Sequence, residues 1–360
     1  MEWLHELSPE FCAKGKELLA TSVWTTEQII FEPAENVVLH QVDRDLIEPD
    51  DAKKVRIETW TAKLEERKGV LEAVNQETRY KIHDDAVGIP ALYEETSNGE
   101  KVKMWAGTTV TLAQSGITSS GSHQINVPVY PINYSEWIAC QNLRYAEEFR
   151  KANLALPYAG LGISVLMVTT DGFIPLTRRG IETPVYPGRL YPPGGGPKPG
   201  QSSTSAILSE VLEETGLEAG KHFNASDLFV MGLVSDSRFD NSDHRRPEIV
   251  ATLPLSLSFR DVELIQHDRS VTKGLREEDV WAVEPITTFV PNLARTIIYS
   301  GYEMCPPTEA GLSLYALLEL VKKEGQDGSL DKMKVLIERM RSFERVQYLP
   351  PIHKLKDLII

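Results

Sequence analysis

The feature that most constrains the fold is a glycine- and proline-rich turn that leads directly into an amphipathic helix. It is the stretch PGGGPKPGQSSTSAILSEVLEETGL at residues 193–217. When the second part is projected as a helix, its apolar side chains share one face, and Glu210, Glu213 and Glu214 lie on the opposite face. Gly216 follows as a typical residue for ending a helix. The stretch therefore predicts a helix with one buried face and one face of three carboxylates.

Three carboxylates without neighbouring lysines repel one another by a few tenths of a kcal/mol per pair. One interpretation is an acidic face that is simply solvated. The other is a divalent cation, because hard cations take oxygen ligands and clustered carboxylates supply them. A bound Mg²⁺, or Mn²⁺ as the alternative ion, would polarise a diphosphate and activate a water molecule.

Size and charge limit the classes of function. The chain has 360 residues and a formal net charge of −14, so we expect two domains and no nucleic-acid partner, because polyanion binding needs a basic face. It contains no apolar run of about 18 residues and no signal-peptide pattern at its start, so we expect no membrane partner. Three cysteines lie far apart without a zinc spacing, which favours a cytoplasmic location.

Changes in sequence texture predict the organisation of the chain. We expect a smaller α+β domain over residues 1–155, which recognises substrate or packs against the rest. A second domain is predicted over 156–345 and a C-terminal tail over 346–360. In the second domain, two apolar runs flank Asp171 and Gly172, which is a strong hairpin signal. Strands then mix with two or more helices, which indicates an α/β arrangement with a mixed sheet.

Helix-forming patterns occur in both predicted domains. The first domain contains SEWIACQNLRYAEEFRKAN at residues 135–153, with Ser135 as the expected N-cap. The glycine-rich turn precedes a predicted helix at about 203–215. Two further helices are predicted near the end of the chain, at 308–325 and about 330–344.

The spacing from Gly195 to Leu217 matches the Nudix motif G-x5-E-x7-R-E-U-x-E-E-x-G-U without a gap. The match includes the glycine pair after proline, the three glutamates, the closing glycine and both aliphatic positions. On these residues the chain resembles the Nudix hydrolase superfamily. The resemblance implies a Nudix α/β/α sandwich with a mixed sheet, preceded by the smaller N-terminal domain. It also implies that Glu210, Glu213 and Glu214 hold the metal, with Glu213 and Glu214 acting in catalysis.

Two positions depart from the motif, because Gln201 and Ser209 stand where it has Glu and Arg. Removing one partner of a buried ion pair leaves an uncompensated charge, which is costly. Here both positions are neutral, so no orphan charge remains. We interpret the two departures together as a swap of scaffold charges that leaves the metal ligands in place.

Further stretches resemble one branch of this superfamily, the UDP-glucose and UDP-galactose pyrophosphatases. They include a tryptophan helix, a Tyr-Lys-Ile-His strand and a Gly-Thr-Thr strand, all ahead of a late Nudix domain. The branch implies Mg²⁺-dependent hydrolysis of a UDP-sugar to UMP and a sugar 1-phosphate. Glu248 matches the extra acid on the strand after the motif, where it completes the metal shell or serves as general base. An edge-strand surface residue is the alternative for Glu248.

Five other residues are expected to contact the substrate. Arg178 and Arg179 end a strand before the motif and could clamp phosphate oxygens, although an exposed pair on a loop would look the same. Lys81 and His83 share a strand face and could reach the diphosphate, unless they are solvated or structural. Gly195 could bring the turn close to phosphate, but the turn itself needs glycines.

Two other functions stay open at this point. The chain could hydrolyse another nucleoside diphosphate derivative, such as ADP-ribose, because the motif handles only the metal and the diphosphate. It could also be a non-catalytic Nudix-fold module that senses nucleotides, a hypothesis that rests on Gln201 and Ser209. The basic segment RMRSFERVQYLPPIHKLKDL near the end indicates a packing or homodimer arm, with a membrane contact as the weaker interpretation.

Overall fold

The structure is a computed structural model of the chain. The structure describes residues 7–19, 24–44, 47–86, 88–113, 117–120, 124–140, 142–154, 156, 160–179, 186, 188–236, 246–273, 280–283 and 304–343.

The centre of the molecule is a five-stranded sheet in the order β1-β13-β14-β9-β12. Strands β14 and β9 run parallel, and the other neighbouring pairs are antiparallel. The predicted α/β class with a mixed sheet is therefore confirmed. The strands are β1 (Trp24–Pro33), β13 (Phe229–Asp236), β14 (Arg246–Pro254), β9 (Gly162–Val168) and β12 (Gly194–Gly195).

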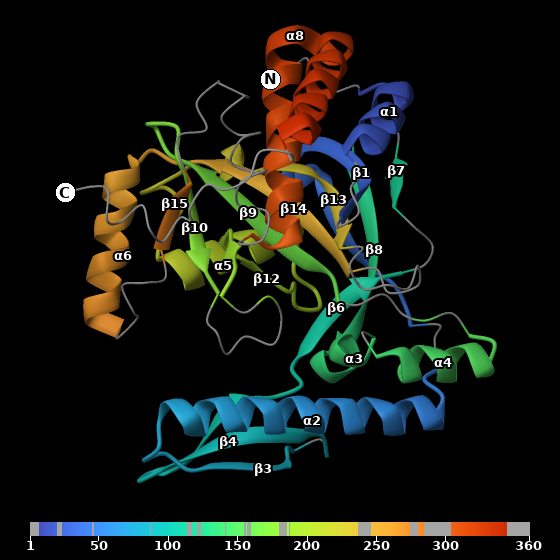
Figure 1. Ribbon diagram of the computed structural model, residues 1–360, viewed down its shortest axis with the longest axis vertical. Helices are drawn as coiled ribbons and strands as arrows, with labels where there is room; N and C mark the ends of the chain where they lie inside the picture. Colours follow the sequence, from blue (N-terminus) through green and yellow to red (C-terminus); the bar gives the residue numbers. More distant parts are fainter. Residues whose placement is uncertain are drawn as a thin grey trace.

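Helices cover both faces of this sheet and give three layers (Figure 1). One face packs against α8 (Pro306–Phe343), which in turn contacts α1 (Pro9–Leu19). The other face packs against α5 (Ser203–Thr215). Helix α8 joins the two predicted C-terminal helices across a break at Gly325, which has non-helical φ and ψ angles of 74° and 179°.

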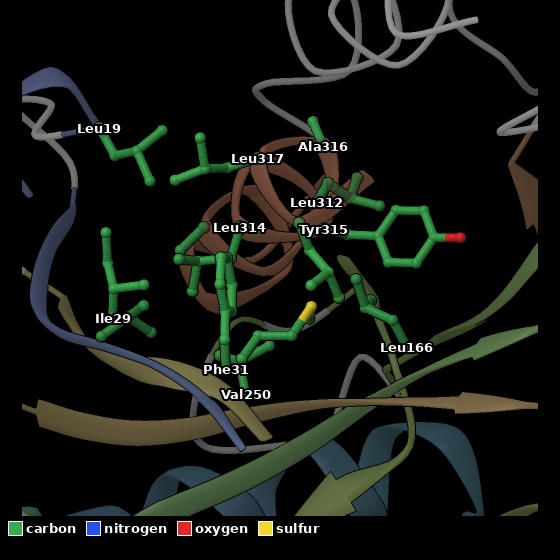
Figure 2. Close-up of a cluster of buried hydrophobic side chains, with 14 of the residues drawn as sticks. Leu19, Ile29, Phe31, Leu166, Val250, Leu312, Leu314, Tyr315, Ala316 and Leu317 are labelled. Atoms are coloured by element: carbon green, nitrogen blue, oxygen red, sulfur yellow. The ribbon is translucent and has the colours of Figure 1, made fainter. Parts of the chain in front are cut away.

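Alternation along the strands assigns each side chain to one of two cores. Leu166 and Val250 belong to the core under α8, where Gly311 lets the helix approach so closely that a Cβ there would lie 2.8 Å from Val250 Cγ1. Figure 2 shows both strand residues beneath this helix. Val165 and Ile249, one position earlier on each strand, belong to the core under α5. Each such fully buried aliphatic side chain contributes about 1.5–3 kcal/mol.

The turn at Asp171 and Gly172 forms as predicted, but it does not close a hairpin. Thr169 N donates to Phe173 O at 2.9 Å, and Gly172 takes a φ of 81°. The strand before the turn joins the main sheet, whereas the strand after it joins a separate three-stranded sheet, β11-β10-β15. The turn therefore links two sheets. The second sheet consists of β10 (Ile174–Arg178), β11 (Leu190–Tyr191) and β15 (Val280–Val283).

A separate region lies at the lower end of the molecule in Figure 1. Its long helix packs on a three-stranded sheet through Trp60, which is fully buried and donates from Nε1 to Pro90 O at 2.6 Å. The elements are α2 (Asp50–Val74), β3 (Tyr80–Asp84), β4 (Pro90–Thr96) and β5 (Gly99–Met104). A turn at Ser97 and Asn98 joins β4 to β5.

A four-stranded sheet and two short helices connect this region to the centre. The predicted helix at 135–153 is two helices, and its N-cap is Asn133 rather than Ser135. Asn133 Oδ1 accepts from Glu136 N at 2.9 Å, and Glu136 Oε2 accepts from Asn133 N at 3.0 Å. This reciprocal capping box outweighs the preference for the serine two residues later. The elements are β2 (Val37–Gln41), β6 (Thr108–Leu112), β7 (Thr118–Ser120), β8 (Gln124–Asn133), α3 (Tyr134–Ala139) and α4 (Leu143–Lys151).

Strand pairing crosses the boundary predicted at residue 155. Strand β1 comes from the first 155 residues, yet it pairs with β13 in the central sheet. The division into domains therefore stays a prediction. Helix α6 (Phe259–Lys273) completes the described elements, among which none is long and apolar enough to cross a membrane.

Candidate functional site

The predicted helix of three glutamates forms at 203–215 and is locked to the glycine turn. Ser202 caps its start, and Gly216 ends it with a left-handed φ of 70°. A Cβ on Gly195 would lie 2.5 Å from Glu210 Oε1, so the carboxylate rests directly on the glycine backbone. Gly194 N donates to Glu214 Oε2 at 3.0 Å. Glycine is thus required at 195 by the Glu210 carboxylate, and at 194 by the backbone of β9, where a Cβ would overlap Ile163 O.

Crowding changes the acidity of this helix face. The pKa of Glu214 rises to about 7, mainly because protein surrounds its carboxyl group, and the Glu210 carboxylate raises it further. Glu214 as a whole residue is exposed, whereas its carboxyl group contacts the glycine turn through the bond from Gly194 N. Burial also raises the pKa of Glu210, with Glu213 as the second cause. The three acids are therefore close enough to oppose each other's ionisation.

The residues present fit a magnesium ion that takes part of its coordination from a ligand. In the described part of the chain, no three His, Cys, Asp or Glu side chains form a ready-made cation cage. Mg²⁺ does not require one, because it commonly binds through one or two carboxylates together with waters and substrate phosphates. Glu210 and Glu214, which repel each other on the glycine turn, provide such a partial set.

Gln201 and Ser209 do not replace the charge pair of the motif with a bond to each other. Gln201 Oε1 accepts from Lys198 N at 2.7 Å and so braces the turn before the helix. Ser209 Oγ donates to Glu213 Oε1 at 3.2 Å on the exposed side of the helix. Each residue supports one part of the motif separately, and neither leaves a charge buried without a partner.

Glu248 is buried in the main sheet and not on its edge, so the alternative of a surface residue is wrong. It is 1% exposed, its carboxylate packs on Gly162, and its Oε1 accepts from the Tyr191 hydroxyl at 2.7 Å. It shares a strand face with Val250, which lies under α8, whereas the other three acids lie on α5. Burial raises the pKa of Glu248. The structure therefore does not bring all four predicted acids to one point.

Arg179 lies between the two sets of acids. Its guanidinium stands 4.9 Å from the centre of the Tyr191 ring, whose hydroxyl binds Glu248. Its charge lowers the pKa of both Glu214 and Glu248. Arg178 points elsewhere and donates to Gly188 O at 2.5 Å. Of the predicted arginine pair, the contacts connect Arg179 to the acids.

A second arginine beside Glu248 was not identified from the sequence. Arg246 stands 4.5 Å from the Trp137 ring centre and 5.3 Å from that of Tyr186. Arg246 and Arg179 both act against the burial that raises the pKa of Tyr134 to about 12. We name these residues the arginine–aromatic cluster. Its members are Tyr134, Trp137, Arg179, Tyr186, Tyr191 and Arg246.

The sequence contains one signal that points to this cluster. Arg246 precedes Glu248 by two positions, so a strand with alternating faces places both on the same side. The aromatic members carry no such signal, because α3, the loop before the motif and β11 supply them from distant parts of the chain.

Lys81 and His83 lie in the sheet of β3, β4 and β5, far from α5 in Figure 1. Lys81 pairs with Glu95 in that sheet. His83 Nε2 lies 2.8 Å from Glu100 Oε2, and its ring stacks on Tyr93 at 4.0 Å. These contacts favour the structural alternative for both residues. The acidic stretch at 277–279 and the tail at 346–360 lie outside the described residues.

Comparisons with known proteins give likenesses in structure only. No protein-family model matches the chain, and no curated protein matches it. A pyrophosphohydrolase variant from Bacillus subtilis is 18% identical, with a TM-score of 0.20, over 26% of this chain and 50% of that one. A MutT protein from Methanosarcina mazei is 15% identical, with a TM-score of 0.22, over 52% and 96%. A Nudix hydrolase from M. smegmatis is 12% identical, with a TM-score of 0.25, over 46% and 88%. Likenesses at these scores do not establish a family for the chain.

Proposed function

We propose that the chain is a Nudix-type, Mg²⁺-dependent hydrolase that cleaves the diphosphate of a UDP-sugar, such as UDP-glucose or UDP-galactose, to UMP and a sugar 1-phosphate. One observation carries the proposal. The motif residues, which are spaced along the sequence, meet in the fold: two carboxylates of the helix contact the glycine turn that precedes it. A solvated acidic face has no reason to press Glu210 and Glu214 onto Gly194 and Gly195.

The acids of α5 have separate roles in this proposal. Glu210, Glu213 and Glu214 would hold Mg²⁺, which supplies positive charge to the diphosphate oxygens when it is bound. The raised pKa of Glu214, about 7, belongs to the metal-free site, and the cation would favour its ionised form. A carboxylate of α5 that is not bound to the cation would accept the proton of the attacking water. The water oxygen then bonds to one phosphorus as the bridging P–O bond breaks, and the sugar phosphate or UMP leaves.

Residues of the arginine–aromatic cluster would position the substrate. Arg179 would offer its planar guanidinium to the phosphate oxygens, and the Tyr191 ring packs against the face of this guanidinium. Glu248 keeps a role as the acid that orients the Tyr191 hydroxyl, because its contacts lead to the arginine and not to the motif. The UDP-sugar specificity itself rests on the sequence resemblance.

The test is a panel of UDP-sugars, other nucleoside diphosphate sugars and ADP-ribose, incubated with the protein and Mg²⁺, with the released nucleoside monophosphate quantified. The proposal predicts UMP from UDP-glucose or UDP-galactose, and loss of that product in Glu214→Gln. Preferred release of AMP from ADP-ribose would show that ADP-ribose, and not a UDP-sugar, is the substrate. Absence of any turnover, with nucleotide binding kept, would make the chain a non-catalytic nucleotide sensor.

A further inference from the structure

Arg246 is a buried charge with incomplete bonding. The residue is 9% exposed, and its Nε and Nη1 atoms are buried. Neither atom has a hydrogen-bond acceptor in the part of the chain that the structure describes. A buried guanidinium normally satisfies its N–H groups, because unpaired donors lose the bonds that water would give them. Arg246 therefore has two donors in need of an acceptor.

Two aromatic rings pack on the faces of the Arg246 guanidinium, and one of the two residues supplies a third unpaired donor. The rings of Trp137 and Tyr186 lie 4.5 and 5.3 Å from its guanidinium carbon. Such stacking leaves the N–H groups in the guanidinium plane for hydrogen-bond acceptors. Trp137 Nε1 is also buried without an acceptor among the described residues. Two neighbouring side chains thus combine three unmatched N–H donors.

The charge of this neighbourhood favours an anion. The charges of Arg179 and Arg246 both lower the pKa of Glu248, so two cations act on one carboxylate. That carboxylate already accepts a bond from Tyr191.

We infer that the unpaired N–H groups of Arg246, together with Trp137 Nε1, form a subsite for a phosphate group of the nucleotide substrate. This inference rests on the proposed function, since it assigns Arg246 and Trp137 to the binding of the same substrate. It also joins α3, from the first half of the chain, to the substrate site of the second half. Arginine presents its N–H donors in a rigid plane that stays charged, a geometry that lysine does not reproduce.

Binding of inorganic pyrophosphate and of UMP, measured by calorimetry in EDTA, tests the subsite apart from metal-dependent chemistry. The variants are Arg246→Met, Arg246→Lys and Trp137→Phe, and the control is Arg260→Met, because Arg260 is an exposed arginine on α6. We expect Arg246→Met to raise both dissociation constants about tenfold or more. Arg246→Lys should recover only part of this loss, Trp137→Phe should raise Kd about threefold, and Arg260→Met should leave it unchanged.

Folding and function are separated by two additional measurements. Circular dichroism checks that each variant is folded. If Arg246→Met does not fold, Trp137→Phe still tests the subsite, because phenylalanine keeps a ring against the guanidinium. Equal dissociation constants in folded Arg246 variants and wild type would overturn the subsite, as would a wild-type protein that binds neither probe. If wild type binds both probes through Arg246 but hydrolyses nothing with Mg²⁺, the subsite stands and the proposed hydrolase fails. If it hydrolyses UDP-sugars with the same KM in folded Arg246→Met, only the subsite fails.

Discussion

The glutamate face of α5 and the arginine–aromatic cluster differ in charge, in construction and in what they would do. The first is acidic and local: one turn and one helix supply all of it. The second is cationic and is assembled from α3, the loop before the motif, β11 and the start of β14. In the proposed function, the acidic face of α5 would hold the metal and the arginine–aromatic cluster would bind the substrate. Arg179, which influences acids on both sides, connects them.

The largest effect is expected from the acidic region. Glu213→Gln and Glu210→Gln each remove a carboxylate that would hold the cation, so kcat should fall on the order of 100-fold or more, equivalent to about 3 kcal/mol of transition-state stabilisation. UMP binding in EDTA should stay unchanged, because the arginines provide it. Glu218→Gln is the control, since Glu218 is an exposed acid just after the helix that faces Lys221. Equal kcat in Glu210→Gln, Glu213→Gln and Glu218→Gln would contradict the assignment of the cation to the acids of α5.

Gly195→Ala should have the next largest effect. Its Cβ would lie 2.5 Å from Glu210 Oε1 and displace that carboxylate, so we expect kcat to fall about tenfold, as for a displaced catalytic group. Gly69→Ala is the matched control, because a Cβ there meets nothing within 4 Å and alanine stabilises a helix by about 1 kcal/mol. Steady-state kinetics and thermal melts measure both. Unchanged turnover in Gly195→Ala would show that contact with Glu210 is not needed.

A pH dependence should appear in the acidic region. The pKa of Glu214 rises from 4.5 to about 7 on folding, so the folded protein binds this proton more tightly than the unfolded chain does. The stabilisation is complete below about pH 4.5 and is lost as the pH rises through 7. In EDTA, the melting temperature of Glu214→Gln should therefore exceed that of wild type increasingly from pH 5 to pH 8. A constant difference across this range would contradict the raised pKa.

The smallest effect is expected where the motif departs from its pattern. Ser209→Ala removes one exposed hydrogen bond to Glu213, and Gln201→Glu keeps an acceptor for Lys198 N. Exposed interactions of this kind contribute about 1 kcal/mol or less, so kcat should change less than about fivefold in either variant. Colorimetric phosphate release after phosphatase treatment measures it. A loss as large as that of Glu213→Gln would make the two positions part of the chemistry.

The features that could be predicted from the sequence are those determined by residues close to one another in the chain. The bounds of α5, its cap at Gly216 and its acidic face follow from periodicity and end signals within one short stretch. The mixed sheet followed from the alternation of strands and helices. Arg246 and Trp137 could not be paired, because only the packing of α3 beside β14 brings them together. The turn at Gly172 was predicted, but the sheet that each flanking strand joins is decided by distant partners.

The most direct test of the central claim is to locate the metal. Crystals soaked in Mn²⁺, which stands in for Mg²⁺, would show the ion in an anomalous difference map. The account predicts a peak beside the carboxylates of Glu210, Glu213 and Glu214, next to the glycine turn, and none at Glu248. A peak at Glu248, or no peak on α5 at saturating Mn²⁺, would contradict it.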